Sequence, residues 1–231
     1  MTFYQIRMAI YSTYLTNVYG FKLKRATTCL EKKRLRIEYA KSLLTTLNIS
    51  VKAEGELKLP NDEPFLLISN HRSIIDPLVI EILFEKTTVF GLWISKKELY
   101  NSFFFGLFTR EGGSILLDRD SKQMSGFFKD IKTNVKEGHS IFLFPEGTRN
   151  KEQIDLSGFK DGASIIALKN RLPILPVYIR TNTQNTLKSS LLENRPKQEV
   201  VIEVGEPIDY RNRPAELEET YRGRFNLHLN P

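Results

Sequence analysis

Apolar residues recur along the N-terminal part of the chain at the spacing of α-helices. Between residues 2 and 19 they follow one another in steps of three and four, which places them on one helical face: Tyr4, Met8, Tyr11, Leu15 and Val18, widened by Phe3, Ile6, Ile10 and Tyr14. A second set of the same kind runs from Leu30 to Leu47, and its polar side carries Lys32, Lys33, Arg34, Arg36 and Lys41. The pattern predicts a pair of amphipathic helices.

From residue 61 onward, short apolar runs alternate with helical stretches, which is typical of a layered α/β fold. The predicted strands are 64–69, 88–94, 114–117, 140–144, 174–179 and 199–204. The predicted helices are 77–86, 97–108, 121–137, 162–170 and 214–222. We therefore expect a single α/β domain with a mixed sheet over residues 55–231, preceded by the helical pair in residues 1–54.

The formal net charge of +7 is unevenly placed. Residues 1–60 contain 11 Lys and Arg against 4 Asp and Glu, and the other 23 and 23 balance. Such a basic segment would be attracted to an anionic membrane or to nucleic acid, although a solvated helix face carries the same pattern. The longest uncharged stretch, residues 8–21, is shorter than the roughly 20 apolar residues of a spanning helix. We expect a peripheral or monotopic protein on the cytoplasmic face of a membrane.

Cysteine and histidine are too few and too scattered for a metal centre. The chain has one cysteine, Cys29, and its three histidines, His71, His139 and His228, lack the spacing of zinc ligands. We expect no metal and no bound cofactor, in a protein that faces a reducing cytosol. The N-terminus lacks the features of a secretory signal. No nucleic-acid motif accompanies the basic segment, which favours a membrane as its partner and argues against nucleic acid.

The sharpest local feature is residues 70–77, between a predicted strand and a predicted helix. One interpretation is structural, because Asp is a good N-cap and Pro is favoured at the first helical position. In the other, His71 lies where a strand ends, the edge at which α/β proteins bind ligands. A turn would let Asp76 accept a hydrogen bond from Nδ1, so that Nε2 could act as a general base. Since no Gly-x-Ser-x-Gly motif is present, a substrate hydroxyl is the simpler proton donor.

Three further polar segments adjoin predicted strands or helices. Residues 144–149 and 118–120 each follow a strand, and residues 158–162 precede a helix. Each could be an ordinary turn with solvated charges. Together they could gather basic side chains whose N–H donors suit the oxygens of a phosphate. These side chains are Arg119, Arg149 and Lys160.

Four segments, in order, resemble the conserved blocks of the glycerol-phosphate and lysophosphatidic acid acyltransferases. The His-x4-Asp block is matched by residues 71–76 and the Glu-Gly-Thr-Arg block by residues 146–149. A second block is matched by residues 113–119 and a proline block by residues 172–177. The resemblance extends over about residues 50–210, so four ordered matches favour membership of this family.

The resemblance implies transfer of a fatty acyl group from acyl-CoA or acyl carrier protein to 1-acyl-glycerol-3-phosphate, which forms phosphatidic acid in phospholipid biosynthesis. His71 would be the general base beside Asp76, and the acceptor hydroxyl would attack the thioester without an acyl-enzyme. Arg119 and Arg149 would hold the phosphate, and Glu146 would position the glycerol. The candidate substrate-binding residues are therefore Arg119, Glu146, Gly147, Thr148, Arg149, Lys97 and Lys160. Lys97 could equally be an ordinary surface lysine.

Three questions stay open on the sequence. The blocks specify acyl transfer better than the acceptor, so another lysophospholipid or lipid acceptor is an alternative. A non-catalytic basic binding module is the alternative outside the enzymes. The aromatic residues Phe103, Phe104, Phe105 and Phe108 could pack in the core, line an acyl groove or enter the bilayer.

Overall fold

Short, buried, apolar strands form the centre of the molecule. This computed structural model describes residues 2–60, 63–118, 124–152, 154–194, 196–211 and 214–227. Within these ranges, seven strands form one sheet. The strands are β1 (Ile49–Glu54), β2 (Leu66–Ser69), β3 (Gly91–Lys96), β4 (Ser114–Leu117), β5 (Ser140–Leu143), β6 (Ile174–Ile179) and β7 (Gln198–Val204).

The strand order is β1-β7-β6-β2-β5-β3-β4. The five strands from β2 to β6 are mutually parallel, β7 is antiparallel to β6, and β1 is parallel to β7. The sheet is therefore mixed, as predicted. Because β2 to β6 run the same way, the segments that leave their carboxyl ends all emerge at one edge of the sheet, where α/β proteins place their ligand sites.

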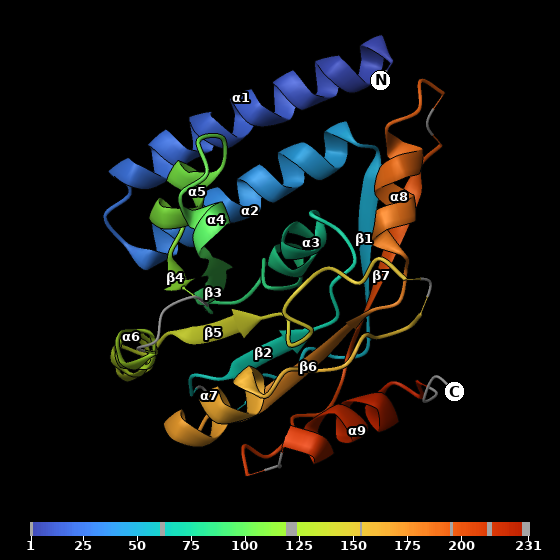
Figure 1. Cartoon of the computed structure of the whole chain (residues 1–231). Helices are drawn as coiled ribbons and strands as arrows, with labels where there is room; N and C mark the ends of the chain where they lie inside the picture. The colour runs from blue at the N-terminus through green and yellow to red at the C-terminus, as the bar shows by residue number, and fades with distance from the viewer. Residues whose placement is uncertain are drawn as a thin grey trace.

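Alternate residues of the central strands serve two apolar layers, one on each face of the sheet. Leu66 and Ile68 of β2 belong to the layer that contains Tyr221 and Phe225, whereas Leu67 belongs to the other. Figure 1 shows α1, α2 and α3 on one side of the sheet and α7 and α9 on the other. The helices are α1 (Phe3–Arg25), α2 (Cys29–Thr46), α3 (Asp76–Leu83), α4 (Lys97–Tyr100), α5 (Gly106–Glu111), α6 (Ser125–Lys136), α7 (Gly162–Asn170), α8 (Thr183–Ser190) and α9 (Pro214–Arg224).

The N-terminal helical pair is present. Thr2 forms a capping box with Gln5 at the start of α1, and the Thr28 side chain accepts the Glu31 N–H at the start of α2. Tyr4 and Met8 of α1 are buried in the same apolar layer as residues of α2, α3 and the sheet. None of the helices that the structure describes is long and apolar enough to cross a bilayer.

The polar side of α2 is partly buried, whereas a basic segment that faces a membrane or solvent would be exposed. The guanidinium of Arg36 donates to a Glu81 carboxylate oxygen of α3 and to the carbonyls of Gly91 (2.7 Å) and Gly112 (3.0 Å). Lys33 is also buried and donates to the Thr87 carbonyl. These two cations dock α2 onto the α/β body, because a charge leaves water only when partners replace its hydration.

Three elements differ from the prediction. The sequence pattern does not indicate strand β1, because this edge strand buries only part of its length. It does not indicate helix α8 either, because the sequence of α8 is mostly polar. The predicted helix 97–108 is two short helices, α4 and α5, since residues 101–105 leave the helical path with three exposed phenylalanines between them.

Candidate active site

The loop that follows β2 is fixed to the neighbouring strand β6 before it reaches His71. The Asn70 side-chain amide donates to the Ile179 carbonyl (3.1 Å), and its oxygen accepts the Ile179 N–H (2.8 Å). Arg72 is buried and donates to the carbonyls of Ile179 (3.1 Å) and Asp155 (2.9 Å). The backbone on both sides of His71 is therefore held to β6.

His71 and Asp76 are in contact, as their spacing predicted. The distance from His71 Nδ1 to Asp76 Oδ2 is 2.8 Å, and the Asp76 side chain is fully buried while 18% of the His71 side chain is exposed. The same Oδ2 accepts the N–H groups of Arg72 (2.6 Å) and Ser73 (2.7 Å). Since a carboxylate accepts from Nδ1, we assign the ring proton to Nδ1, which makes Nε2 the nitrogen with the lone pair.

The structural interpretation of Asp76 as an N-cap does not hold. The N-cap of α3 is Ile75, without a side-chain hydrogen bond, and Asp76 is the first helical residue. Its carboxylate turns back to the loop that carries His71. Asp76 therefore folds this loop and orients the imidazole.

Thr183, which the sequence did not single out, completes the partners of Asp76. This first residue of α8 is fully buried, and its hydroxyl donates to Asp76 Oδ1. The two residues are 107 positions apart, so no local sequence pattern predicts the contact. Its only sequence signal is its place just after β6, at the same edge as His71.

Glu146 connects the His71 loop to the segment between β5 and α7. Its side chain is almost fully buried; Oε1 accepts the His71 N–H (2.7 Å), and Oε2 accepts the Ser157 N–H (2.9 Å) and hydroxyl. Burial raises the pKa of Glu146, and the donors from Ser157 and His71 act in the opposite direction. The Asn150 N–H adds a bond to the His71 carbonyl (2.7 Å). The Glu-Gly-Thr-Arg segment and the His71 loop thus form one hydrogen-bonded unit.

The remaining candidates lie around this unit. Gly147 has φ +71°, a left-handed conformation that favours glycine, so the tight turn after Glu146 explains its residue type. Thr148, Arg149 and Lys160 are exposed, and the Lys160 N–H binds the Pro145 carbonyl (2.8 Å).

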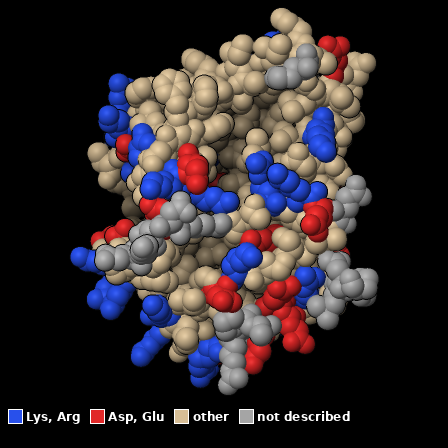
Figure 2. Space-filling view, viewed as in Figure 1, with Lys and Arg blue, Asp and Glu red and all other residues tan. Residues whose placement is uncertain are grey.

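Two further candidates leave the ends of β3 and β4. Lys97 Nζ lies 2.7 Å from Asp118 Oδ2. Arg119 lies outside the described residues. Figure 2 shows that the face turned to the viewer is hollowed near its centre and that Lys and Arg side chains border the hollow on both sides. This charge distribution suits an anionic ligand.

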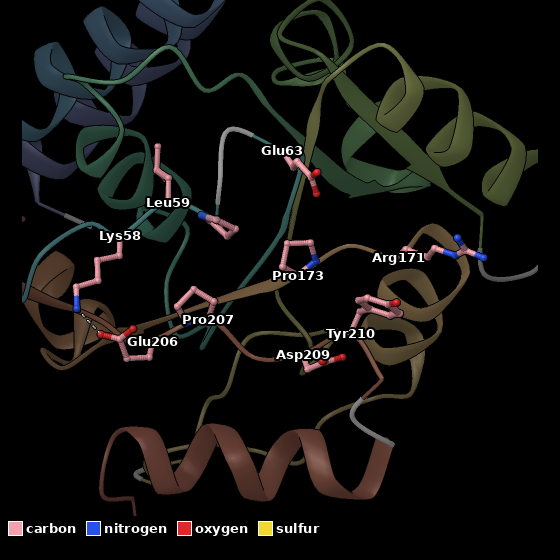
Figure 3. A pocket seen from close by; sticks show the side chains of 10 residues that line it. Lys58, Leu59, Glu63, Arg171, Pro173, Glu206, Pro207, Asp209 and Tyr210 are labelled. Atoms are coloured by element: carbon pink, nitrogen blue, oxygen red, sulfur yellow. Dashed lines mark hydrogen bonds and ion pairs between the residues drawn. The ribbon is translucent and has the colours of Figure 1, made fainter.

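A separate open depression of about 440 Å³ lies at the opposite edge of the sheet. Figure 3 shows Pro173 and Glu63, which precede β6 and β2, together with the Lys58–Glu206 ion pair (2.8 Å). None of the predicted site residues among those that the structure describes lines it. We therefore place the candidate site around His71.

The sequence model of the family described as Acyltransferase matches residues 50–180, more than half of the chain. The protein belongs to this family, and all four sequence blocks fall within the matched range, which confirms the resemblance.

Two relatives carry names that agree with this assignment, and a solved structure shows the same fold. A 1-acyl-sn-glycerol-3-phosphate acyltransferase of Helicobacter pylori is 36% identical over 49% of this chain and 47% of its own length. One from Streptococcus pneumoniae is 28% identical over 78% of this chain and 65% of its own length. The chain thus spans about half to two thirds of the curated relatives that it matches. The crystal structure of the 1-acyl-sn-glycerophosphate acyltransferase PlsC from Thermotoga maritima has the same fold, with a TM-score of 0.70, 22% identity, and 99% and 95% of the two chains covered.

Proposed function

We propose that the protein transfers a fatty acyl group from acyl-CoA or acyl carrier protein to the free hydroxyl of 1-acyl-glycerol-3-phosphate, forming phosphatidic acid. The observation that carries this proposal is the pair of His71 and Asp76 at the carboxyl edge of the parallel strands. Family membership supports acyl transfer, and the names of the relatives support this acceptor.

In the proposed reaction, His71 Nε2 removes the proton of the acceptor hydroxyl as its oxygen attacks the thioester carbonyl carbon. Asp76 stabilises the imidazolium that forms, because its carboxylate already accepts from Nδ1. The tetrahedral intermediate then collapses with cleavage of the carbon–sulfur bond. The proton held on His71 passes to the departing thiolate, so the products are the new ester and a free thiol.

The other candidates divide into two proposed roles. Arg149 and Arg119 bind the acceptor phosphate, with Lys97 and Lys160 adding positive charge nearby. Glu146 positions the His71 backbone, since protein donors occupy both of its carboxylate oxygens. This role differs from the glycerol contact that the resemblance implied.

Gly147 and Thr148 belong to the same segment and shape the turn that leads to Arg149. Gly147 supplies the left-handed conformation and bonds the Phe144 carbonyl through its N–H (3.0 Å). Thr148 is exposed beside it, and we assign its hydroxyl the role of a donor to the bound acceptor.

We further propose that the protein docks on an anionic membrane through an apolar surface centred on α1, here called the α1 surface. Five of its residues lie along α1 and are exposed, and three more come from the segment before α5: Phe3, Ile6, Ile10, Tyr14, Phe21, Phe103, Phe104 and Phe105. The two parts adjoin, because the Asn17 amide donates to the Phe104 carbonyl (3.2 Å). At the top of the face in Figure 2, where α1 lies, the surface is mostly uncharged.

Exposed apolar patches of this kind mark interaction surfaces, and a membrane would supply the lipid substrate directly. The exposed cations of α1, Arg7, Lys22, Lys24 and Arg25, suit anionic headgroups. Lys33 and Arg36 of α2 are buried and take no part.

An acceptor panel tests the reaction. Purified protein is supplied with acyl-CoA or acyl carrier protein and with 1-acyl-glycerol-3-phosphate, lysophosphatidylcholine or a phosphate-free monoacylglycerol, and the products are identified by mass spectrometry. We expect phosphatidic acid as the main product. Arg149→Ala should raise the Michaelis constant for the phosphate acceptor roughly tenfold or more, because it removes a charge-assisted contact. Equal losses with the phosphate-free acceptor would assign Arg149 a structural role instead.

A further inference from the structure

The imidazole of His71 stacks on an aromatic ring. The centroids of His71 and Phe144 are 4.0 Å apart and the planes differ by 11°. Phe144 is the residue between β5 and the Pro145-Glu146 turn, and it is half-buried. This contact fixes the plane of the imidazole, whereas the bond to Asp76 fixes its direction within that plane. Together they determine where Nε2 points.

Phe144 is itself held by a second aromatic residue. Trp93 of β3 stacks on Phe144 with centroids 5.1 Å apart and planes 25° apart. The indole N–H of Trp93 donates to Glu81 Oε1 (2.7 Å), and its ring meets Phe142 edge-on. Since Glu81 is the buried partner of Arg36, the Trp93 ring has little freedom to move. The Phe144 ring is therefore a fixed support.

We propose that Phe144 is a positioning residue that stabilises the imidazolium form of His71 during acyl transfer. This inference rests on the proposed function, in which Nε2 takes the hydroxyl proton. The face of a phenyl ring carries negative electrostatic potential, so it attracts a cation whose centre lies within about 6 Å. The imidazole becomes such a cation only after proton transfer. The contact therefore strengthens along the reaction, which is the condition for lowering the barrier.

The charged side chains beside His71 come from three segments. Asp76 contacts the ring from α3, and Glu146 contacts the backbone N–H from the loop after β5. Arg72, in the His71 loop itself, turns its guanidinium to carbonyls of β6 and of Asp155. A change confined to the electrons of the Phe144 ring leaves all three in place.

The experiment varies, in steps, the negative electrostatic potential on the face of the ring at position 144. Phenylalanine is replaced by mono-, di- and trifluorinated phenylalanines, which keep the shape while withdrawing charge from the ring face, and by Phe144→Leu and Phe144→Tyr. For each full-length protein, kcat, both Michaelis constants, the pH profile of kcat/KM and thermal stability are measured. His71→Ala is measured in parallel.

We expect kcat to fall stepwise with fluorination, by roughly 2- to 30-fold at the trifluorinated ring, with both Michaelis constants unchanged. The acidic limb of the pH profile should move to lower pH, because the protonated imidazole loses support. Phe144→Tyr should retain most activity and Phe144→Leu should resemble the trifluorinated protein. If fluorination changes neither kcat nor the acidic limb, Phe144 only packs and the inference is wrong. If His71→Ala keeps normal activity, the proposed function itself fails, whatever the fluorinated series shows.

Discussion

The His71 corner and the α1 surface are built on opposite principles. In the His71 corner, formed by His71, Asp76, Glu146 and Thr183, polar groups turn inward and find partners from four separate segments. On the α1 surface, apolar groups turn outward, and Phe3, Ile10 and Phe103 are at least 66% exposed. The hydrogen bonds of the His71 corner fix the positions of its side chains, whereas the α1 surface exposes apolar area to its surroundings. We infer that the two regions divide the work, with chemistry in one and access to lipid in the other.

The largest effect is expected from a substitution that changes the His71 corner and leaves the α1 surface intact. His71→Ala should lower turnover by about 10²- to 10⁴-fold, because it removes the proposed general base. Folding should be largely intact, since the loop is held by backbone and Asp76 contacts that do not need the imidazole. Binding to vesicles should not change. The measurements are steady-state kinetics, thermal unfolding and vesicle sedimentation, and a folded variant with normal turnover would contradict the assignment.

The second prediction addresses the α1 surface. Ile10→Glu should weaken binding to anionic vesicles about tenfold or more, because it removes an apolar side chain from the proposed membrane interface and adds a negative charge. Turnover with a short-chain, water-soluble acceptor should stay near that of the unmodified protein. Sedimentation with vesicles and a kinetic assay measure the two properties.

Leu168→Glu is the matched control, because Leu168 is similarly exposed but lies on α7, across the sheet from α1. It should bind vesicles like the unmodified protein. Equal losses for both variants would show that added negative charge alone is responsible and would remove the support for the α1 surface.

The contrast also explains how far the sequence could be read. The helical pair, the α/β class and the contact between His71 and Asp76 were predictable, because they rest on local periodicity or on two residues of one loop. The periodicity of α1 showed apolar positions but could not separate the covered Tyr4 and Met8 from the exposed Ile10, since the partners of a helix lie elsewhere in the chain.

Polar contacts between residues far apart in the sequence could not be predicted from local patterns. Glu146 meets His71 across 75 positions and Thr183 meets Asp76 across 107. In the same way, the position of Arg36 in the sequence is typical of a solvated helix residue, but in the structure Arg36 is buried in an ion pair with Glu81 of α3. Hydrogen bonds of this kind depend on which strand ends become neighbours, and the order of strands has no local signature.

The third prediction concerns the support of Asp76. Thr183→Val removes the hydroxyl that donates to Oδ1 and should lower kcat by about 2- to 10-fold, the effect of losing one hydrogen bond in a positioning network. The Michaelis constants should change little. Thr183→Ser keeps the donor and should restore most of kcat. If the serine and valine variants lose activity equally, the methyl group of Thr183 matters for packing and its hydroxyl does not.

The smallest effect concerns the pH dependence of stability at Glu146. Burial raises the pKa of this carboxyl above its ordinary 4.5, so the folded protein holds the proton more tightly than the unfolded chain does. The resulting contribution to stability is present below 4.5 and is lost as the pH rises through the folded-state value. A glutamine at this position does not titrate.

The free energy of unfolding of the unmodified protein minus that of Glu146→Gln should therefore decrease from below pH 4.5 toward neutrality. Urea unfolding at several pH values measures it, with Glu152→Gln, at an exposed site, as the control for loss of one negative charge. A difference that instead grows with pH would mean that the N–H and hydroxyl donors of His71 and Ser157 favour the anion more than burial opposes it. Glu146 would then hold the His71 loop as an anion at neutral pH. Its removal would weaken the His71 corner most under the conditions in which we propose that His71 acts as a base.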